Sequence, residues 1–223
     1  MKHMVLPLQW SVHLVTKRSG ETHPSLKNVV IHNVLEENYH RSPCRSQRRW
    51  LCGKMWYNRW LVNTTNLRRF TGELLLVFEA DFLFCKQPAL QLSDFAADIM
   101  RNEYMFIGAP WERDGECRRR MSMLPTRPPS MRHCVGNGGF SLMRRTQIIE
   151  VFDHFPANST EFLWDFYASR VIQWSGGFVA SPTRASYFSI ESGKVVPKLG
   201  PPLAIHKAML LDKSFSKKCS DFF

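Results

Sequence analysis

The sequence lacks the features that mark several common protein classes. Its longest uninterrupted apolar runs, such as residues 74–78, are far shorter than the roughly 20 residues that span a bilayer. The N-terminus has no apolar core followed by a small-residue cleavage site, so it does not resemble a signal peptide. No repeat and no low-complexity tract occurs. We therefore expect no membrane-spanning helix in this chain, while its compartment stays open because a preceding segment can carry an anchor or a secretory signal.

Paired cysteine motifs are also missing. The six cysteines form no C-x-x-C pair, which disfavours a zinc ribbon or a thioredoxin-like site. Neither their pairing nor the redox compartment follows from the sequence. Asn63 and Asn158 each begin an N-x-[ST] glycosylation sequon, which matters only if the chain is secreted.

Acidic residues are few compared with basic ones. Nineteen Asp and Glu against thirty Lys and Arg give a net charge of +11 and an isoelectric point near 9.7. Such a charge favours an anionic partner, either nucleic acid, an acidic membrane or a phosphorylated small molecule. The length of 223 residues and the 44% hydrophobic content are those of an ordinary globular chain and favour a single domain.

Hydrophobic periodicity predicts strands alternating with helices. Alternation over 8–14, apolar residues at 29–31 and the continuous apolar run at 73–78 are typical of strands, the last buried on both faces of a parallel sheet. Further along the chain we expect helices over 93–101, 148–155 and 160–173, strands over 104–108, 138–143, near 178 and over 187–190, and a long loop over 112–132. This order predicts an α/β fold with a mostly parallel sheet.

Two segments carry candidate chemistry. Glu79 and Asp81 follow the 73–78 strand at positions i and i+2, so both carboxylates point to one side and can share one hard divalent cation. Asn137 lies in the glycine-rich segment 135–141 with Gly138 and Gly139, where the backbone allows close approach of a ligand. Plain alternatives are an acidic strand end and a tight turn.

Four motifs occur in an order that resembles a widespread uncharacterised family of glycosyltransferase-like domains, similar in plan to GT-A glycosyltransferases. They are FEADFLFC at 78–85, FIGAPW at 106–111, VGNGGFSL at 135–142 and IHK at 205–207. The resemblance covers residues 6–211 and leaves 212–223 as a C-terminal tail. It implies one Rossmann-like domain over 1–223 that binds a nucleotide-sugar donor and transfers the sugar to an unknown acceptor, using Mn²⁺ or Mg²⁺.

The resemblance also implies roles for single residues. The metal ligands would be Glu79, Asp81 and His206, and carboxylates with an imidazole suit manganese. The remaining binding residues would be Lys207, as a point charge near the diphosphate, with Asn137, Gly138, Gly139 and Trp111 lining the substrate pocket.

Two departures from the family pattern are visible. The family carries a Glu-Asp pair after the glycine-rich motif, whereas here Trp164 precedes Asp165, so Asp165 is the candidate acceptor-side base and Glu161, four residues earlier, its stand-in. Glu191 matches a family position without an assigned role. The family's first strand and helix are also missing before residue 6, so the fold is expected to lack its first β-α unit and donor binding is open.

Two other functions remain as alternatives. The first is a catalytically inactive glycosyltransferase-like binding domain. The second is a nucleic-acid-binding module on the basic aromatic segment 45–60, where tryptophan would stack on bases and arginine would neutralise phosphates. That segment equally fits a helix whose aromatic residues pack in the core, and no RNP, KH or zinc-finger signature accompanies it.

Overall fold

The computed structural model describes residues 12–16, 29–33, 57–79, 82–111, 133–157, 163–191, 197–206 and 219. It divides the chain into two compact units, residues 1–72 and 73–223, and each is described by itself. The expectation of one domain with a core over 6–211 stays a prediction. No helix in the described ranges is long and apolar enough to cross a membrane.

The N-terminal unit contains one parallel pair of strands and a short helical segment. Strands β1 (Val12–Thr16) and β2 (Val29–Asn33) pair in parallel, which confirms a strand at 29–31. Residues 57–62 are helical, and α2 (Thr64–Leu67) follows directly, with Asn63 as its N-cap. Trp60 is only 1% exposed and packs edge-on against Phe70, so its ring belongs to the interior of this unit.

The C-terminal unit is built on two three-stranded sheets. The first has the order β3-β6-β5, with β3 (Leu74–Phe78), β6 (Val135–Arg144) and β5 (Phe106–Pro110) antiparallel throughout. The second has the order β4-β8-β7. In it β4 (Phe82–Phe84) runs antiparallel to β8 (Ala204–His206), whereas β7 (Ser189–Glu191) runs parallel to it.

The sequence predicts a mostly parallel, Rossmann-like sheet, as in a GT-A-like domain that lacks its first β-α unit. The antiparallel β3-β6-β5 sheet shows that this prediction of the fold class is wrong. The apolar run at 74–78 does form a strand, but among the described strands β3 pairs only with β6, at the edge of an antiparallel sheet. Four of its five residues are partly buried and Phe78 is exposed, so β3 is not covered on both faces. A short apolar run fixes the presence of a strand but not the direction of its partner.

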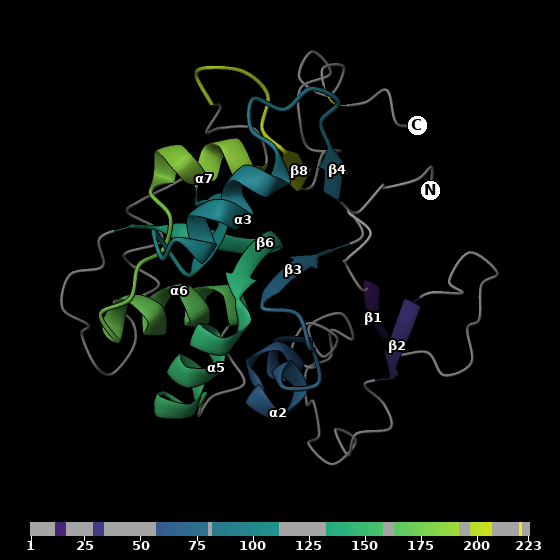
Figure 1. Ribbon diagram of the computed structural model, residues 1–223, viewed down its shortest axis with the longest axis vertical. Helices are drawn as coiled ribbons and strands as arrows, with labels where there is room; N and C mark the ends of the chain where they lie inside the picture. Colours follow the sequence, from purple (N-terminus) through teal and green to yellow (C-terminus); the bar gives the residue numbers. More distant parts are fainter. Residues whose placement is uncertain are drawn as a thin grey trace, which may run out of the picture. The chain divides into compact units, whose positions relative to one another are not determined.

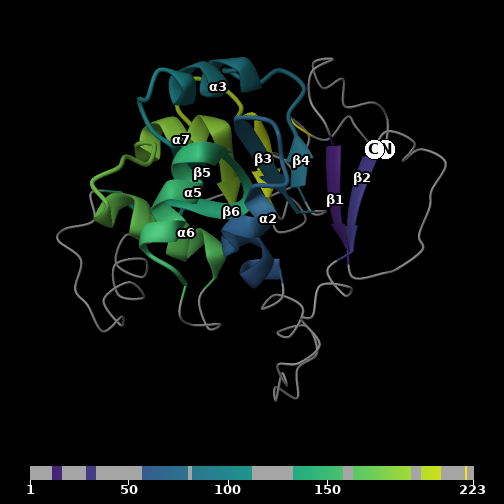
Figure 2. The same cartoon turned by 60° about the horizontal axis from the view of Figure 1, so that its bottom comes forward.

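In the described part of this unit, four helices pack on this framework: α3 (Leu92–Met100), α5 (Arg145–His154), α6 (Trp164–Trp174) and α7 (Pro182–Phe188). Figures 1 and 2 show α3 and α7 on one side of the β3-β6-β5 sheet and α5 and α6 on the other. The helices predicted over 93–101 and 148–155 are confirmed with shifted starts. The first begins earlier because Gln91 and Asp94 form a capping box.

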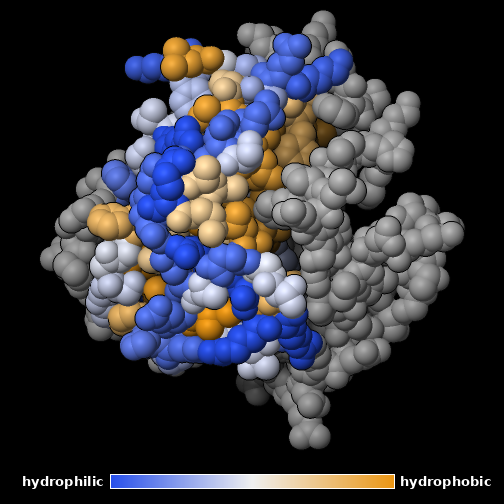
Figure 3. Space-filling model, viewed as in Figure 1, coloured by the Kyte–Doolittle hydropathy of each residue, from blue (hydrophilic) through white to orange (hydrophobic). Residues whose placement is uncertain are grey.

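Phenylalanine rings join the two sheets and their helices. Phe140 of β6 stacks on Phe82 of β4 with ring centroids 5.3 Å apart, and it also packs against Phe188 of α7. Phe188 in turn meets Phe95 of α3. On the face that Figure 3 shows, hydrophilic residues predominate over the helices and are interrupted by apolar patches, and apolar residues also come to the surface near β3 and β4. Phe78, at the end of β3, is 40% exposed.

A buried carboxylate holds α3 to α7. Asp98, 4% exposed, accepts hydrogen bonds from the guanidinium of Arg184, from Arg101 at 2.6 Å and from the Tyr104 hydroxyl at 3.0 Å. Arg184 also lies over the Phe95 ring, 4.7 Å from its centroid. Burial, together with the Asp98 charge, raises the pKa of Tyr104, so this tyrosine stays protonated. The cluster therefore acts as a structural clamp.

A second polar cluster joins the start of β3 to the end of β6. Glu73 accepts hydrogen bonds from Arg144 at 2.7 Å and from Thr146 at 2.5 Å. Burial alone would raise the pKa of Glu73, but the hydrogen bonds from Thr146 and Arg144 lower it below its ordinary value. Asn102, with a positive φ of 62°, accepts from Arg144 and Gln147 in the same cluster.

Candidate functional site

His206 is the centre of a polar site that the two sheets form together. It ends β8, and its side chain is only 3% exposed. The imidazole lies directly over Gly139 of β6, because a Cβ built on that glycine would meet three ring atoms at 2.1–2.3 Å. Only glycine leaves room for the ring at this position. Gly139 therefore admits the His206 ring, whereas its predicted role beside a substrate pocket stays a prediction.

Glu79 reaches the same imidazole from the end of β3. The backbone N–H of Glu79 donates to the Gly139 carbonyl at 2.8 Å, which extends the β3–β6 pairing by one residue. Its carboxylate oxygen Oε2 lies 3.3 Å from Nε2 of His206. The Glu79 side chain is 34% exposed, so it forms the solvent-facing side of the pair. Two residues far apart in sequence therefore meet, and their predicted role as metal ligands stays a prediction.

Glu191 lies on the other side of the ring. It pairs in register with His206 across the parallel strands β7 and β8, which places both side chains on one face. Its Oε1 lies 3.5 Å from Nδ1 of His206, and its Oε2 accepts a hydrogen bond from the side-chain amide of Asn137. Asn137 is 8% exposed, and its own Oδ1 accepts from the Gly139 N–H at 3.3 Å.

A bulge in β6 produces this arrangement. Along the β5–β6 pair, Gly108 faces Ser141 but the next residue, Ala109, faces Asn137, so residues 138–140 are extra on β6. The same stretch keeps its pairing with β3 through Phe140. Bulges re-aim side chains at functional sites. Here the bulge turns Asn137 toward Glu191 and brings the Gly139 backbone beneath the imidazole.

The donor set fits a divalent cation at Glu79 and His206. Ligand atoms about 2.1 Å from one metal lie about 3.0–3.4 Å apart when they subtend 90–110°, and the Glu79–His206 separation is 3.3 Å. Glu191 faces Nδ1 and therefore favours a proton on that nitrogen. The lone pair of Nε2 then points toward the metal position, as in metal-bound histidines whose other ring nitrogen faces a carboxylate. Without a metal, the same pair can share a proton as an imidazolium–carboxylate contact.

Glu191 lies on the opposite side of the ring from Glu79, so the two carboxylates and the imidazole do not converge on one point. Within the described ranges no group of three His, Cys, Asp or Glu side chains is arranged to hold a metal ion. The third predicted ligand, Asp81, lies outside the described residues. So do Lys207 and Glu161, the predicted diphosphate contact and stand-in base.

Gly138 is part of the β6 bulge, between Asn137 and Gly139, whereas Trp111 and Asp165 lie in separate surroundings. Trp111 follows β5, and its ring stacks on Phe166 of α6 with centroids 4.2 Å apart, beside Cys134. Asp165 is in the first turn of α6, 9% exposed, and its Oδ1 accepts from the Phe166 N–H at 2.8 Å. That bond supports the helix start and leaves its role as a base a prediction.

Glu191 is the residue of this site for which the sequence motifs indicated no role. The sequence predicts a strand over 187–190, just before Glu191, but the acid lies beside His206 only because β7 and β8 pair in parallel and in register. No local pattern predicts that pairing.

The site thus belongs to an α/β protein in which sheets of mixed direction bring a histidine, an asparagine and two glutamates together. A family model described as "Protein of unknown function (DUF5672)" matches residues 44–206, which is well over half of the chain, and the chain belongs to this family. The match ends at His206 and contains Glu79, Asn137 and Glu191. No curated protein matches the chain.

Proposed function

We propose that this protein is a metal-dependent glycosyltransferase that moves a sugar from a nucleotide-sugar donor to an acceptor. The observation that carries the proposal is the 3.3 Å approach of Glu79 Oε2 to His206 Nε2, from the ends of two strands in different sheets. The motifs that contain these residues are those on which the glycosyltransferase resemblance rests. The proposal relies on the site and not on the fold, because one fold serves many functions.

Glu79 and His206 would hold the cation, with Asp81 as the predicted third ligand. When bound, a divalent cation neutralises the negative charge that develops on the departing diphosphate. Glu191 orients the imidazole through Nδ1, and Asn137 fixes the other oxygen of Glu191. Because His206 is buried and Glu79 is one-third exposed, a phosphate group would approach from the Glu79 side.

The roles of three further residues are proposals that rest on the sequence. Lys207 follows His206 directly in the chain and would add positive charge for the diphosphate. Asp165, or Glu161, would accept the proton of the acceptor hydroxyl. The net charge of +11 suits an anionic donor. The acceptor and the sugar are not defined by these residues.

The alternative of a nucleic-acid-binding module has less support. Trp60 is 1% exposed and packs on Phe70, so its ring is not available for stacking on a base. Residues 45–56 of that segment lie outside the described residues. The other alternative, an inactive domain that keeps the site for binding, differs from the enzyme only in turnover.

Calorimetric titration of the full chain with a panel of nucleotide sugars, with and without Mn²⁺, tests the proposal. We expect manganese-dependent binding that Glu79→Gln weakens at least tenfold, since the variant removes an anionic ligand. Glu150→Gln, at an exposed position on α5, is the matched control and should bind as the parent does. Equal binding by Glu79→Gln and the parent would refute the metal assignment, and binding without donor hydrolysis or transfer would indicate the inactive domain.

A further inference from the structure

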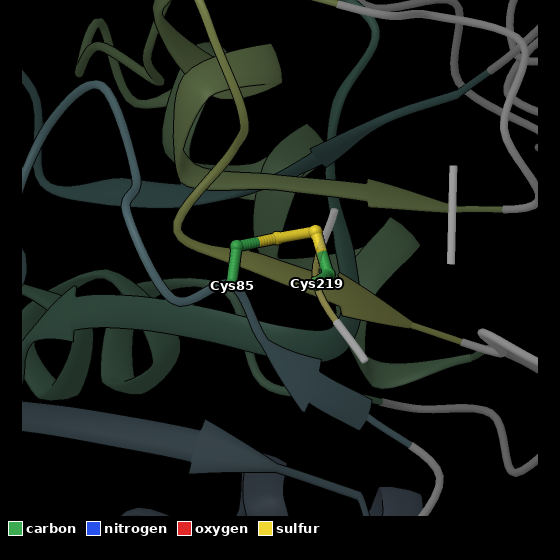
Figure 4. The surroundings of a disulfide bond; sticks show 2 residues. All are labelled: Cys85 and Cys219. Carbon is green, nitrogen blue, oxygen red and sulfur yellow. A yellow bond between two sulfur atoms is a disulfide. The ribbon is translucent and has the colours of Figure 1, made fainter. Parts of the chain in front are cut away.

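The described cysteines are all oxidised. Cys85, just after β4, is disulfide-bonded to Cys219 (Figure 4), and Cys134 is disulfide-bonded as well. No free thiol remains among the cysteines of the described ranges. The Cys85–Cys219 bridge is buried with Ile190 of β7 and Ile205 of β8, on the sheet that ends in His206. It is thus part of the core beneath the candidate site.

Disulfides of this kind indicate where a chain folds. They form and persist in oxidising compartments and are rare where glutathione and thioredoxin keep thiols reduced. One buried disulfide and a second buried, disulfide-bonded cysteine in the C-terminal unit are therefore evidence for folding in an oxidising compartment. In eukaryotic cells the lumen in which such bridges form is also where asparagine side chains are glycosylated.

The N-terminal unit carries a sequon that the structure leaves accessible. Asn63-Thr64-Thr65 satisfies the N-x-[ST] pattern, and both Asn63 and Thr65 are exposed. The Asn63 Oδ1 accepts a hydrogen bond from the Thr65 backbone N–H at 3.0 Å. This bond uses the amide oxygen and not Nδ2, the atom to which a sugar is attached. Neighbouring Asn66, by contrast, is 2% exposed and has no sequon.

We propose that Asn63 is an N-glycosylation site and that the protein folds in the oxidising, glycosylating compartment of a secretory pathway. The proposal rests on two independent observations, the disulfide-bonded cysteines of the C-terminal unit and the exposed sequon of the N-terminal unit. It does not depend on the proposed transferase activity. The second sequon, at Asn158, lies outside the described residues and carries no part of the argument.

The chemistry is a group transfer from an oligosaccharide joined to a lipid diphosphate. A bond forms between Asn63 Nδ2 and the anomeric carbon, and the bond from that carbon to the diphosphate oxygen breaks. The lipid diphosphate leaves with the electron pair, and the amide nitrogen loses one proton to a base of the transferring enzyme. Nothing is oxidised or reduced.

Peptide mapping of the protein isolated from the cells that naturally produce it gives the direct test. Treatment with peptide N-glycosidase in heavy-oxygen water converts a glycan-bearing asparagine to labelled aspartate. We expect the label at position 63 and a non-reduced peptide linking Cys85 to Cys219. An unlabelled Asn63, or free thiols at Cys85 and Cys219 before reduction, would overturn the proposal.

Two matched variants, made in the full chain and directed into the secretory pathway of a eukaryotic host, separate glycosylation from folding. Both carry Asn158→Gln, so that only position 63 is read. Thr65→Ser keeps the sequon and should retain the loss of apparent mass on deglycosylation, whereas Thr65→Ala should abolish it. Both keep the backbone N–H that donates to Asn63. An equal loss of apparent mass in both variants on deglycosylation would contradict the assignment. If a variant is not secreted, the peptide map of the natural protein decides.

Discussion

Replacing Gly139 with alanine should displace His206 and disable the candidate site. The added Cβ would lie 2.1 Å from Cε1 and 2.2 Å from Nδ1 of the imidazole. Carbon atoms approach to about 3.5 Å at their closest comfortable contact, so the ring must move by about 1.4 Å. Such a shift breaks the 3.3 Å approach to Glu79 and the 3.5 Å approach to Glu191.

Two magnitudes follow from this displacement. Overpacking of a buried position costs about 1–3 kcal/mol of unfolding free energy. A misplacement of about 1 Å in a site costs on the order of 100-fold in function, so manganese-dependent donor binding should fall by about that factor. Chemical denaturation measures the first, and calorimetric titration measures the second.

Gly176→Ala is the matched control for Gly139→Ala. Gly176 has a positive φ of 86°, and a Cβ there would meet no atom within 4 Å. The variant should therefore lose about 1 kcal/mol of stability through backbone strain, while its binding stays that of the parent. The reasoning is refuted if Gly139→Ala binds manganese and donor as the parent does, or if its crystal structure shows the imidazole in the same place.

Three further predictions concern the residues around the site and the two polar clusters. Glu191→Gln should lower manganese affinity about 10–100-fold in a titration, because it removes the charge that orients the imidazole; unchanged affinity would exclude the positioning role. Asp98→Asn should lower the unfolding free energy by roughly 3 kcal/mol, since Arg184 and Tyr104 lose their buried anionic partner. The control Glu103→Gln, at an exposed position, should lower it by less than about 1 kcal/mol. Equal losses of unfolding free energy in denaturant melts would contradict this prediction. The pKa of Glu73 is lowered in the folded chain, so its contribution to stability is present above the ordinary glutamate pKa and is lost as pH falls through the folded pKa. Glu73→Gln should therefore reduce the loss of unfolding free energy on acidification. An unchanged dependence of stability on acidic pH would show that other carboxylates dominate it.

The elements of this protein could be predicted well from local patterns. Alternation and apolar runs located β2, β3, β5 and β6, and Pro156 marked the end of α5. The short strands predicted near 178 and over 187–190 leave out one helix, α7, although Ser181-Pro182 is a typical helix start. The short apolar segment at 185–190 is shared between the end of α7 and β7, so periodicity alone could not divide it.

Pairing direction and site assembly could not be predicted in the same way. The direction of β3 relative to β6 depends on contacts across 60 or more residues, which a local apolar run does not encode. The motifs identified Glu79, Asn137, Gly139 and His206 one by one. Glu191 lies beside these residues only because β7 pairs in parallel with β8 in this register and because β6 contains a bulge. The catalytic roles of Asp165 and Glu161 stay predictions.

Anomalous diffraction at the manganese absorption edge tests the central claim most directly. Crystals of the full chain grown with Mn²⁺ and a nucleoside diphosphate should show an anomalous peak bound by Glu79 Oε2 and His206 Nε2, about 2.1–2.2 Å from each. The peak should be lost in Glu79→Gln crystals prepared in the same way. A map with no peak at this pair, with the imidazole instead sharing a proton with Glu79, would contradict the account.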